Sequence, residues 1–213
     1  MERTTDSMET MPVTRRSLHG LAELLLAGPQ YRRSGTIRLR VVPGGFATVS
    51  EPDLRFADGM ILADGQFAFV ADGFTCARLG GRIGSEAGAP EGLYQDGSGV
   101  LPDEELRIDA ADAAVLMAAL AVGEAALRTV GAHGEPVLWP EHFDLGVTVG
   151  EVNFGVSLGD GFLGEPYAYV GPWKVPAGKF WNAPFGAART LRELGDYAAV
   201  ADYFAEGRRQ PLN

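Results

Sequence analysis

The chain has 213 residues, of which 46% are hydrophobic and 22% are charged, a composition typical of a globular protein long enough to bury a sizeable core. Its net charge of −10 argues against a nucleic-acid partner and against binding to an anionic membrane surface. The one cysteine, Cys76, excludes an intramolecular disulfide and a multi-cysteine zinc site, and it fits a reducing cytoplasm.

The N-terminal part of the chain combines a polar tail with a helix. Residues 1–13 carry charges of both signs and no apolar segment, so we predict a disordered tail and no signal peptide. Thr14–Ala27 is predicted to be a helix, and Gly28-Pro29 is typical of a helix end. His19 and Glu23 are four residues apart on one face of this helix, which fits a metal-ligand pair but is more typical of a local hydrogen bond. No run of about 18 uncharged apolar residues occurs, so we predict no transmembrane helix and a cytoplasmic protein.

The segment 35–78 is rich in strand patterns. Residues 36–42 alternate between polar and apolar side chains and turn into residues 46–49. A second hairpin is predicted around Asp64-Gly65. Residues 84–102 are rich in Gly, Ser, Pro and acidic side chains, which predicts a surface loop. Its length fits a mobile lid, although an insertion without function is the favoured interpretation.

Two further helices are predicted downstream. Asp109 is a good N-cap for a helix over Asp109–Arg128, whose body is apolar nearly all round, so we expect a central and mostly buried helix. The many alanines of this helix permit close approach to a sheet. Residues Ala187–Phe204 carry an apolar stripe typical of a final helix, and residues 208–213 are predicted to be a loose tail.

The order of these elements predicts the fold class. Hairpins cluster before and after the middle helix, which favours an α+β protein over alternating βαβ units. We therefore predict mostly antiparallel sheets built from hairpins, packed on the buried Ala-rich helix and flanked by N- and C-terminal helices. A single globular domain is predicted over residues 14–207.

The stretch between the middle and last helices has the clearest hairpin pattern. Residues 142–149 and 152–157 both alternate between apolar and polar side chains. Gly150-Glu151 between them suits a two-residue type II′ loop. This loop length predicts the register of the hairpin, with Asp144 opposite Ser157.

Residues 165–170 are predicted to add a third strand to this hairpin. If the polar faces of the three strands align, seven side chains converge: His142, Asp144, Asn153, Ser157, Glu165, Tyr167 and Tyr169. A solvated face of an antiparallel sheet would show the same alternation. The absence of Lys and Arg from this face, and its two tyrosines and one histidine, favour a binding site.

Four sequence blocks in the same stretch resemble an uncharacterised bacterial domain family of unknown function. The blocks are His142-Phe-Asp-Leu, Gly159-Asp160, Glu165-Pro-Tyr-Ala-Tyr-Val and Pro172-Trp173. The resemblance implies a shared domain and brings no established reaction. Leu158 stands where relatives tend to have proline, and residues 161–164 lack a histidine that relatives often carry there.

Aromatic and polar side chains on this face predict a pocket for a small organic molecule, because aromatic walls with a few converging polar groups are typical of such sites. The predicted ligand-binding residues are Trp139, Asn153, Ser157, Tyr167, Tyr169, Trp173 and Trp181. The carboxylates Asp144 and Glu165 favour a cationic or amine-bearing ligand, which tyrosine faces can also attract. If the pocket is catalytic, His142 is the natural proton-transfer group, with Asp144 and Glu165 beside it.

Two alternatives stay open. A divalent metal could be held by His142, Asp144 and Glu165 with His19 as a further ligand, although the usual triad has two histidines and one carboxylate. The Tyr/Trp face could instead hold a protein partner or a second copy of the chain, because interfaces are also rich in these residues. The sequence identifies no cofactor or reaction and leaves open whether the protein is an enzyme.

Overall fold

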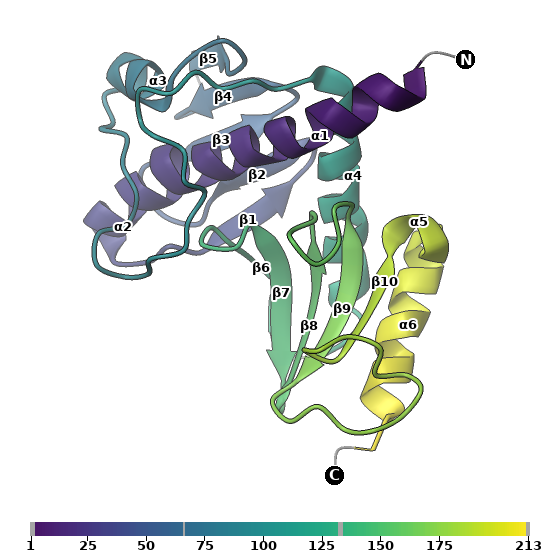
Figure 1. Ribbon diagram of the computed structural model, residues 1–213. Helices are drawn as coiled ribbons and strands as arrows, with labels where there is room; N and C mark the ends of the chain where they lie inside the picture. Colours follow the sequence, from purple (N-terminus) through teal and green to yellow (C-terminus); the bar gives the residue numbers. More distant parts are fainter. Residues whose placement is uncertain (1–2, 66, 132–133, 212–213) are drawn as a thin grey trace. The chain divides into compact units, whose positions relative to one another are not determined.

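The computed structural model describes residues 3–65, 67–131 and 134–211, and helices and antiparallel strands form the predicted α+β protein (Figure 1). Contacts divide the chain into two compact units, and the single domain predicted over residues 14–207 stays a prediction. Unit 1 comprises Met1–Ala118 and Leu138–Phe143, and unit 2 comprises Ala119–Val137 and Asp144–Asn213. The predictions for residues 1–2 and 212–213 lie outside the described residues.

Unit 1 contains an antiparallel sheet with the strand order β6-β1-β2-β3-β4-β5. Its strands are β1 (Leu39–Val42), β2 (Gly45–Thr48), β3 (Leu54–Ala57), β4 (Met60–Ala63), β5 (Phe67–Val70) and β6 (Val137–Trp139). Both predicted hairpins are present, and β3, which was not predicted, joins them. The β-rich segment is followed by helix α3 (Cys76–Ile83). This helix begins after Thr75, because the Thr75 hydroxyl accepts from the Arg78 N–H and caps the helix N-terminus. Cys76 is fully buried, and this burial raises the pKa of its thiol to about 12.

The N-terminal helix is longer than predicted. Helix α1 (Arg3–Gly20), the π-helix η1 (Leu21–Ala27) and helix α2 (Gly28–Ser34) follow one another without a break (Figure 1). Most of the predicted disordered tail is therefore helical. The predicted end at Gly28-Pro29 is also wrong, since Gly28 has helical φ and ψ and its N–H donates to the Glu23 carbonyl.

Pro29 changes the hydrogen bonding of this helix without ending it. Proline has no N–H to donate to the preceding turn, so a carbonyl of that turn needs another partner. The Leu24 carbonyl accepts from the backbone N–H of Gly88, which lies in the long loop that follows α3. The close approach requires glycine at 28, because a Cβ there would lie 1.6 Å from the Gly88 oxygen.

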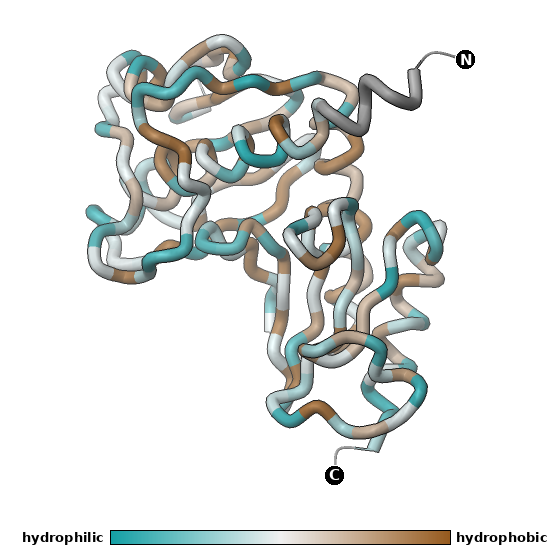
Figure 2. The backbone as a smooth tube through the Cα atoms, viewed as in Figure 1, coloured by the Kyte–Doolittle hydropathy of each residue, from teal (hydrophilic) through white to brown (hydrophobic). Residues whose placement is uncertain are grey.

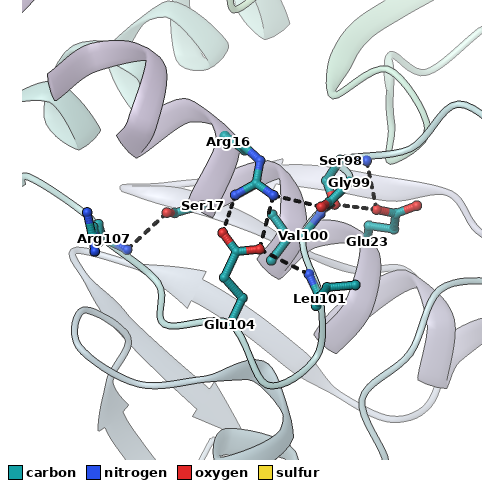
Figure 3. Close-up of polar contacts among 9 residues, drawn as sticks. All are labelled: Arg16, Ser17, Glu23, Ser98, Gly99, Val100, Leu101, Glu104 and Arg107. Carbon is teal, nitrogen blue, oxygen red and sulfur yellow. Dashed lines mark hydrogen bonds and ion pairs between the residues drawn. The ribbon is translucent and has the colours of Figure 1, made fainter. Parts of the chain in front are cut away.

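The loop predicted over residues 84–102 is a loop, and it is fastened to the N-terminal helices (Figure 3). The Ser98 N–H and hydroxyl donate to Glu23 Oε2 at 2.9 and 2.6 Å. Arg16 forms an ion pair with Glu104 and donates to the Gly99 carbonyl at 2.6 Å. These contacts hold the loop against the helices, whereas a mobile lid would have few such contacts.

The segment 100–108, which leads to the middle helix, is also bound to the rest of unit 1. Its apolar and polar residues are interspersed (Figure 2), and Val100, Leu106 and Ile108 are buried. The Arg107 N–H donates to the Ser17 hydroxyl at 3.0 Å (Figure 3). The side chains of this segment therefore add to the core of unit 1.

Helix α4 (Ala110–Leu127) begins as predicted, because the Asp109 carboxylate accepts from the N–H groups of Ala111 and Asp112. One face of the helix is buried and the opposite face is exposed, so the prediction of a mostly buried helix holds for half of it. By length and composition α4 is the one helix in the described residues that could cross a membrane, and 50% of it is buried inside the protein. A partly buried helix of a soluble protein passes the same test.

Unit 2 contains a sheet with the strand order β10-β9-β8-β7 and two helices. The elements are β7 (Asp144–Val149), β8 (Val152–Ser157), β9 (Tyr167–Pro172), β10 (Ala187–Thr190), α5 (Leu191–Leu194) and α6 (Tyr197–Arg209). The predicted β7–β8 register is confirmed, with Asp144 opposite Ser157. The final helix predicted over Ala187–Phe204 is wrong in its first part: β10 pairs with β9, and Thr190 and Asp196 cap two separate helices.

Helix α6 covers the sheet of unit 2. The rings of Phe154 on β8 and Phe204 on α6 meet edge to face at 6.0 Å between centroids, and both are buried. The C-terminal part is more ordered than predicted, since α6 includes Arg208 and Arg209 and the Arg208 guanidinium donates to the Val130 carbonyl.

Candidate functional site

Four side chains of the predicted convergent face do meet in unit 2. Asp144, Ser157 and Tyr167 occupy paired positions on three neighbouring strands. Tyr169 crosses β8 and donates its hydroxyl to Asp144 Oδ2 at 2.5 Å. Gly155 lies beneath the tyrosine ring, and a Cβ at this glycine would lie 2.3 Å from the ring carbon that bears the hydroxyl.

Aromatic rings pack against one another over this face. The rings of Tyr167 and Tyr169 each lie 6.4 Å from that of Phe185, and Phe162 meets Phe185 at 5.1 Å. The Tyr167 hydroxyl donates to Asp160 Oδ2 at 2.6 Å. Burial, followed by the neighbouring aspartates, raises the pKa of both tyrosines. The two hydroxyls are therefore neutral donors with partners inside the protein, and the face packs as a small aromatic core.

The remaining residues predicted for this site in unit 2 point to other partners. Glu165 precedes β9 and forms an exposed ion pair with Arg192 at 2.8 Å, which lowers the pKa of Glu165. The Asn153 side-chain oxygen accepts a hydrogen bond from the Thr148 hydroxyl. Trp181 packs against Phe180 with 5.0 Å between ring centroids.

Trp173 is 67% exposed. Its predicted role in self-association stays a prediction.

His142 does not continue the strand pattern of β7. Phe143 has φ of +51°, which turns the chain immediately before Asp144 and breaks the alternation predicted through residue 142. His142 lies in that turn, belongs to unit 1 and is exposed. Its role in proton transfer stays a prediction.

The predicted metal site is not assembled. Among residues 3–65, 67–131 and 134–211, no group of three or more His, Cys, Asp or Glu side chains could hold a metal ion. Asp144 accepts a hydrogen bond from Tyr169, and Glu165 accepts one from Arg192. His19 contacts a backbone carbonyl, as described below.

Unit 1 contains a pocket of about 480 Å³. Its walls come from the end of α2, the approach to β1, the long loop and the turn after β6. The lining residues are Gly35, Thr36, Ile37, Arg38, Leu93, Tyr94, Trp139 and Glu141. A volume of this size is in the range of small-molecule sites, and aromatic walls with few polar groups are typical of them.

One polar atom of this pocket, Glu141 Oε2, is buried without a hydrogen-bond partner in the described residues. The Tyr94 hydroxyl is also buried and interacts with the Glu23 carboxylate. Burial raises the pKa of Tyr94, and the negative charges of Glu23 and Glu141 raise it further. A neutral phenol therefore lies near two carboxylates, and neither carboxylate has an ion pair within the described part of the chain.

His19 and Glu23 have separate partners, so the predicted local hydrogen bond between them is not formed. Nε2 of His19 lies 2.7 Å from the Pro140 carbonyl, and the ring stacks on Phe143 with 5.4 Å between centroids. Glu23 is 4% exposed and accepts from Ser98. The pair therefore fastens the turn after β6 and the long loop, which both contribute walls to the pocket.

His19 is expected to make the protein less stable as pH falls. Burial lowers the pKa of this imidazole, so the unfolded chain, with a pKa near 6.5, takes up a proton before the folded protein does. The contribution of His19 to the free energy of unfolding is complete above that pKa. It is lost progressively as pH falls toward the lower pKa of the folded state.

Urea unfolding at pH 7.5 and pH 5.5 measures this effect in the wild type and in His19→Gln. The glutamine amide can still donate to the Pro140 carbonyl, but it takes up no proton in this pH range. The variant should therefore lose less stability between the two pH values than the wild type. An equal loss in both proteins would contradict the assignment.

Sequence patterns missed most of this pocket. Trp139 was among the predicted ligand-binding residues, but Arg38, Tyr94 and Glu141 were not. These three residues come from segments far apart in the sequence, and no spacing rule links them. Position 94 carries an aromatic residue in a loop otherwise rich in Gly, Ser, Pro and acidic residues, and this contrast could have indicated a contact site.

Comparisons with protein-family models, with curated proteins and with solved structures give no match to this chain. The family resemblance of the blocks between His142 and Trp173 therefore stays a prediction.

Proposed function

We propose that the pocket of unit 1 binds a small, amine-bearing organic molecule. The observation that carries the proposal is Glu141, a pocket-lining carboxylate with no ion pair in the described residues and with Oε2 buried and unbonded. A buried polar atom without a partner costs free energy, and an uncompensated negative charge attracts a cation. An ammonium group beside Glu141 provides the missing charge and hydrogen-bond donors.

The aromatic walls support the same class of ligand. Tyr94 and Trp139 both line the pocket and are half-buried. Aromatic faces attract ammonium groups by roughly 0.5–2 kcal/mol and pack against apolar parts of a ligand. The carboxylate supplies the charge recognition and the rings supply the contact area.

Replacing Glu141 with glutamine is expected to weaken amine binding by about tenfold or more, because hydrogen bonds to charged groups contribute about 1.5–3 kcal/mol. Isothermal titration calorimetry with benzylamine and phenethylamine measures the change. The amide keeps the size of the side chain and removes its charge.

Glu51→Gln is the matched control, because Glu51 is an exposed carboxylate of unit 1 that does not line the pocket. It should bind both amines as the wild type does. The proposal is wrong if neither amine binds the wild type, or if Glu141→Gln binds them with unchanged affinity.

A further inference from the structure

Two side chains of opposite charge line the pocket of unit 1. Arg38 and Glu141 both border the same cavity, yet they form no ion pair with each other, and neither forms an ion pair with another side chain of the described residues. A ligand with only an amino group would satisfy Glu141 and leave Arg38 unused. We propose that the ligand is zwitterionic, an amino acid whose carboxylate is recognised by Arg38 and whose ammonium is recognised by Glu141. This inference rests on the proposed function.

Backbone contacts on both sides position Arg38. Its N–H donates to the Thr36 hydroxyl at 3.3 Å, and its carbonyl accepts from the Gln30 side chain at 2.9 Å. Gln30 is buried and also accepts from the Val49 N–H at 2.6 Å, so its amide joins the backbone segments next to β1 and β2. The backbone of Arg38 is therefore held in place, and the residue itself is exposed.

The head of Arg38 is placed over an aromatic wall of the pocket. Its guanidinium carbon lies 5.8 Å from the centre of the Trp139 ring. Stacking on an aromatic face leaves the N–H groups at the edge of the guanidinium plane available to an anion. Arginine binds carboxylates with two parallel hydrogen bonds, which a single ammonium point charge cannot do.

The apolar part of the lining indicates the side chain of the amino acid. Ile37 and Leu93 lie among the lining residues with Tyr94 and Trp139. These surfaces suit an aliphatic or aromatic group, and a cavity of about 480 Å³ has room for one such molecule. The charges and apolar side chains of the lining therefore support an apolar amino acid over a simple amine or a simple carboxylic acid.

Calorimetry with three matched compounds tests the inference: phenylalanine, phenethylamine, which lacks the carboxylate, and 3-phenylpropanoate, which lacks the amine. The wild type is expected to bind phenylalanine about tenfold more tightly than phenethylamine, because only phenylalanine has a carboxylate that can form charged hydrogen bonds with Arg38. In Arg38→Gln this ratio should fall to about one or below, because the variant loses the carboxylate partner of phenylalanine and no longer repels the ammonium group of phenethylamine.

Two further variants make the result specific. Arg38→Lys keeps the positive charge and should retain part of the preference for phenylalanine. Arg55→Gln removes an exposed arginine of β3 that does not line the pocket and should leave all three affinities unchanged.

The outcomes separate this inference from the proposed function. Equal binding of phenylalanine and phenethylamine, unchanged in Arg38→Gln, overturns the zwitterion and leaves the amine site standing. Binding of 3-phenylpropanoate alone, or of none of the three compounds, overturns both. Loss of phenylalanine preference in Arg38→Gln, with wild-type unfolding curves for the variant, supports both.

Discussion

Replacing Gly28 with alanine is expected to lower the free energy of unfolding by about 2 kcal/mol or more, the range of severe overpacking. The new Cβ would lie 1.6 Å from the Gly88 carbonyl oxygen, which is backbone and cannot rotate away. The loop must therefore move, and the hydrogen bond from Gly88 to the Leu24 carbonyl is lost with it. Urea unfolding followed by circular dichroism measures the loss.

Gly81→Ala is the matched control, because Gly81 also lies in a helix but has no atom within 4 Å of its ideal Cβ position. Alanine has the higher helix propensity, so this variant should be neutral or more stable by up to roughly 1 kcal/mol. Equal effects of the two substitutions would show that Gly28 is not required for close approach of the loop.

Replacing Gly155 with alanine is expected to destabilise unit 2 by about 2–3 kcal/mol, because the Tyr169 ring occupies the space that the methyl group needs. The Cβ would lie 2.3 Å from both the hydroxyl oxygen and the ring carbon that bears it. Moving the ring breaks the hydrogen bond to Asp144 and disturbs the contact with Phe185. Thermal unfolding in the near-ultraviolet, where tyrosine packing is visible, reports on the loss.

A double-mutant cycle tests this explanation. In a Tyr169→Leu background the ring is absent, so adding Gly155→Ala should cost little. Gly171→Ala in β9 is the control, since the closest atom to its added Cβ is at 3.4 Å, near ordinary contact distance. A full loss from Gly155→Ala in the Tyr169→Leu background would contradict the role of the ring.

Local patterns were sufficient where neighbouring residues determine the structure. The β7–β8 hairpin was predicted with its register, because a two-residue loop and strict alternation leave no other pairing. The start of α4 was predicted for the same kind of reason, since the Asp109 cap acts within one helical turn. The fold class followed from the order of such elements.

Local patterns failed where a distant segment supplies the partner. Gly28-Pro29 has the composition of a helix end, but the helix continues because Gly88 satisfies the Leu24 carbonyl. The last predicted helix begins as β10 because β9 offers it a strand edge. Neither partner can be read from the residues that surround these positions.

The candidate site shows the same division. Strand pairing brings Asp144, Ser157, Tyr167 and Tyr169 together, as the sequence pattern predicted, but the pattern gave no indication that Phe185 and Phe162 pack beside the two tyrosines. His142 was lost from this face through one residue, Phe143, whose positive φ has no sequence signature in a bulky side chain. The pocket of unit 1 depends on tertiary contacts throughout.

The bond between Gly88 and Leu24 joins main-chain atoms, so no side-chain substitution in the loop can delete it except replacement by proline at 88. Together with Ser98 on Glu23, it anchors both ends of the stretch that carries Leu93 and Tyr94. Neither anchor uses the side chain of Leu93 or Tyr94, so a substitution at these two positions changes the pocket lining and leaves both anchoring hydrogen bonds in place.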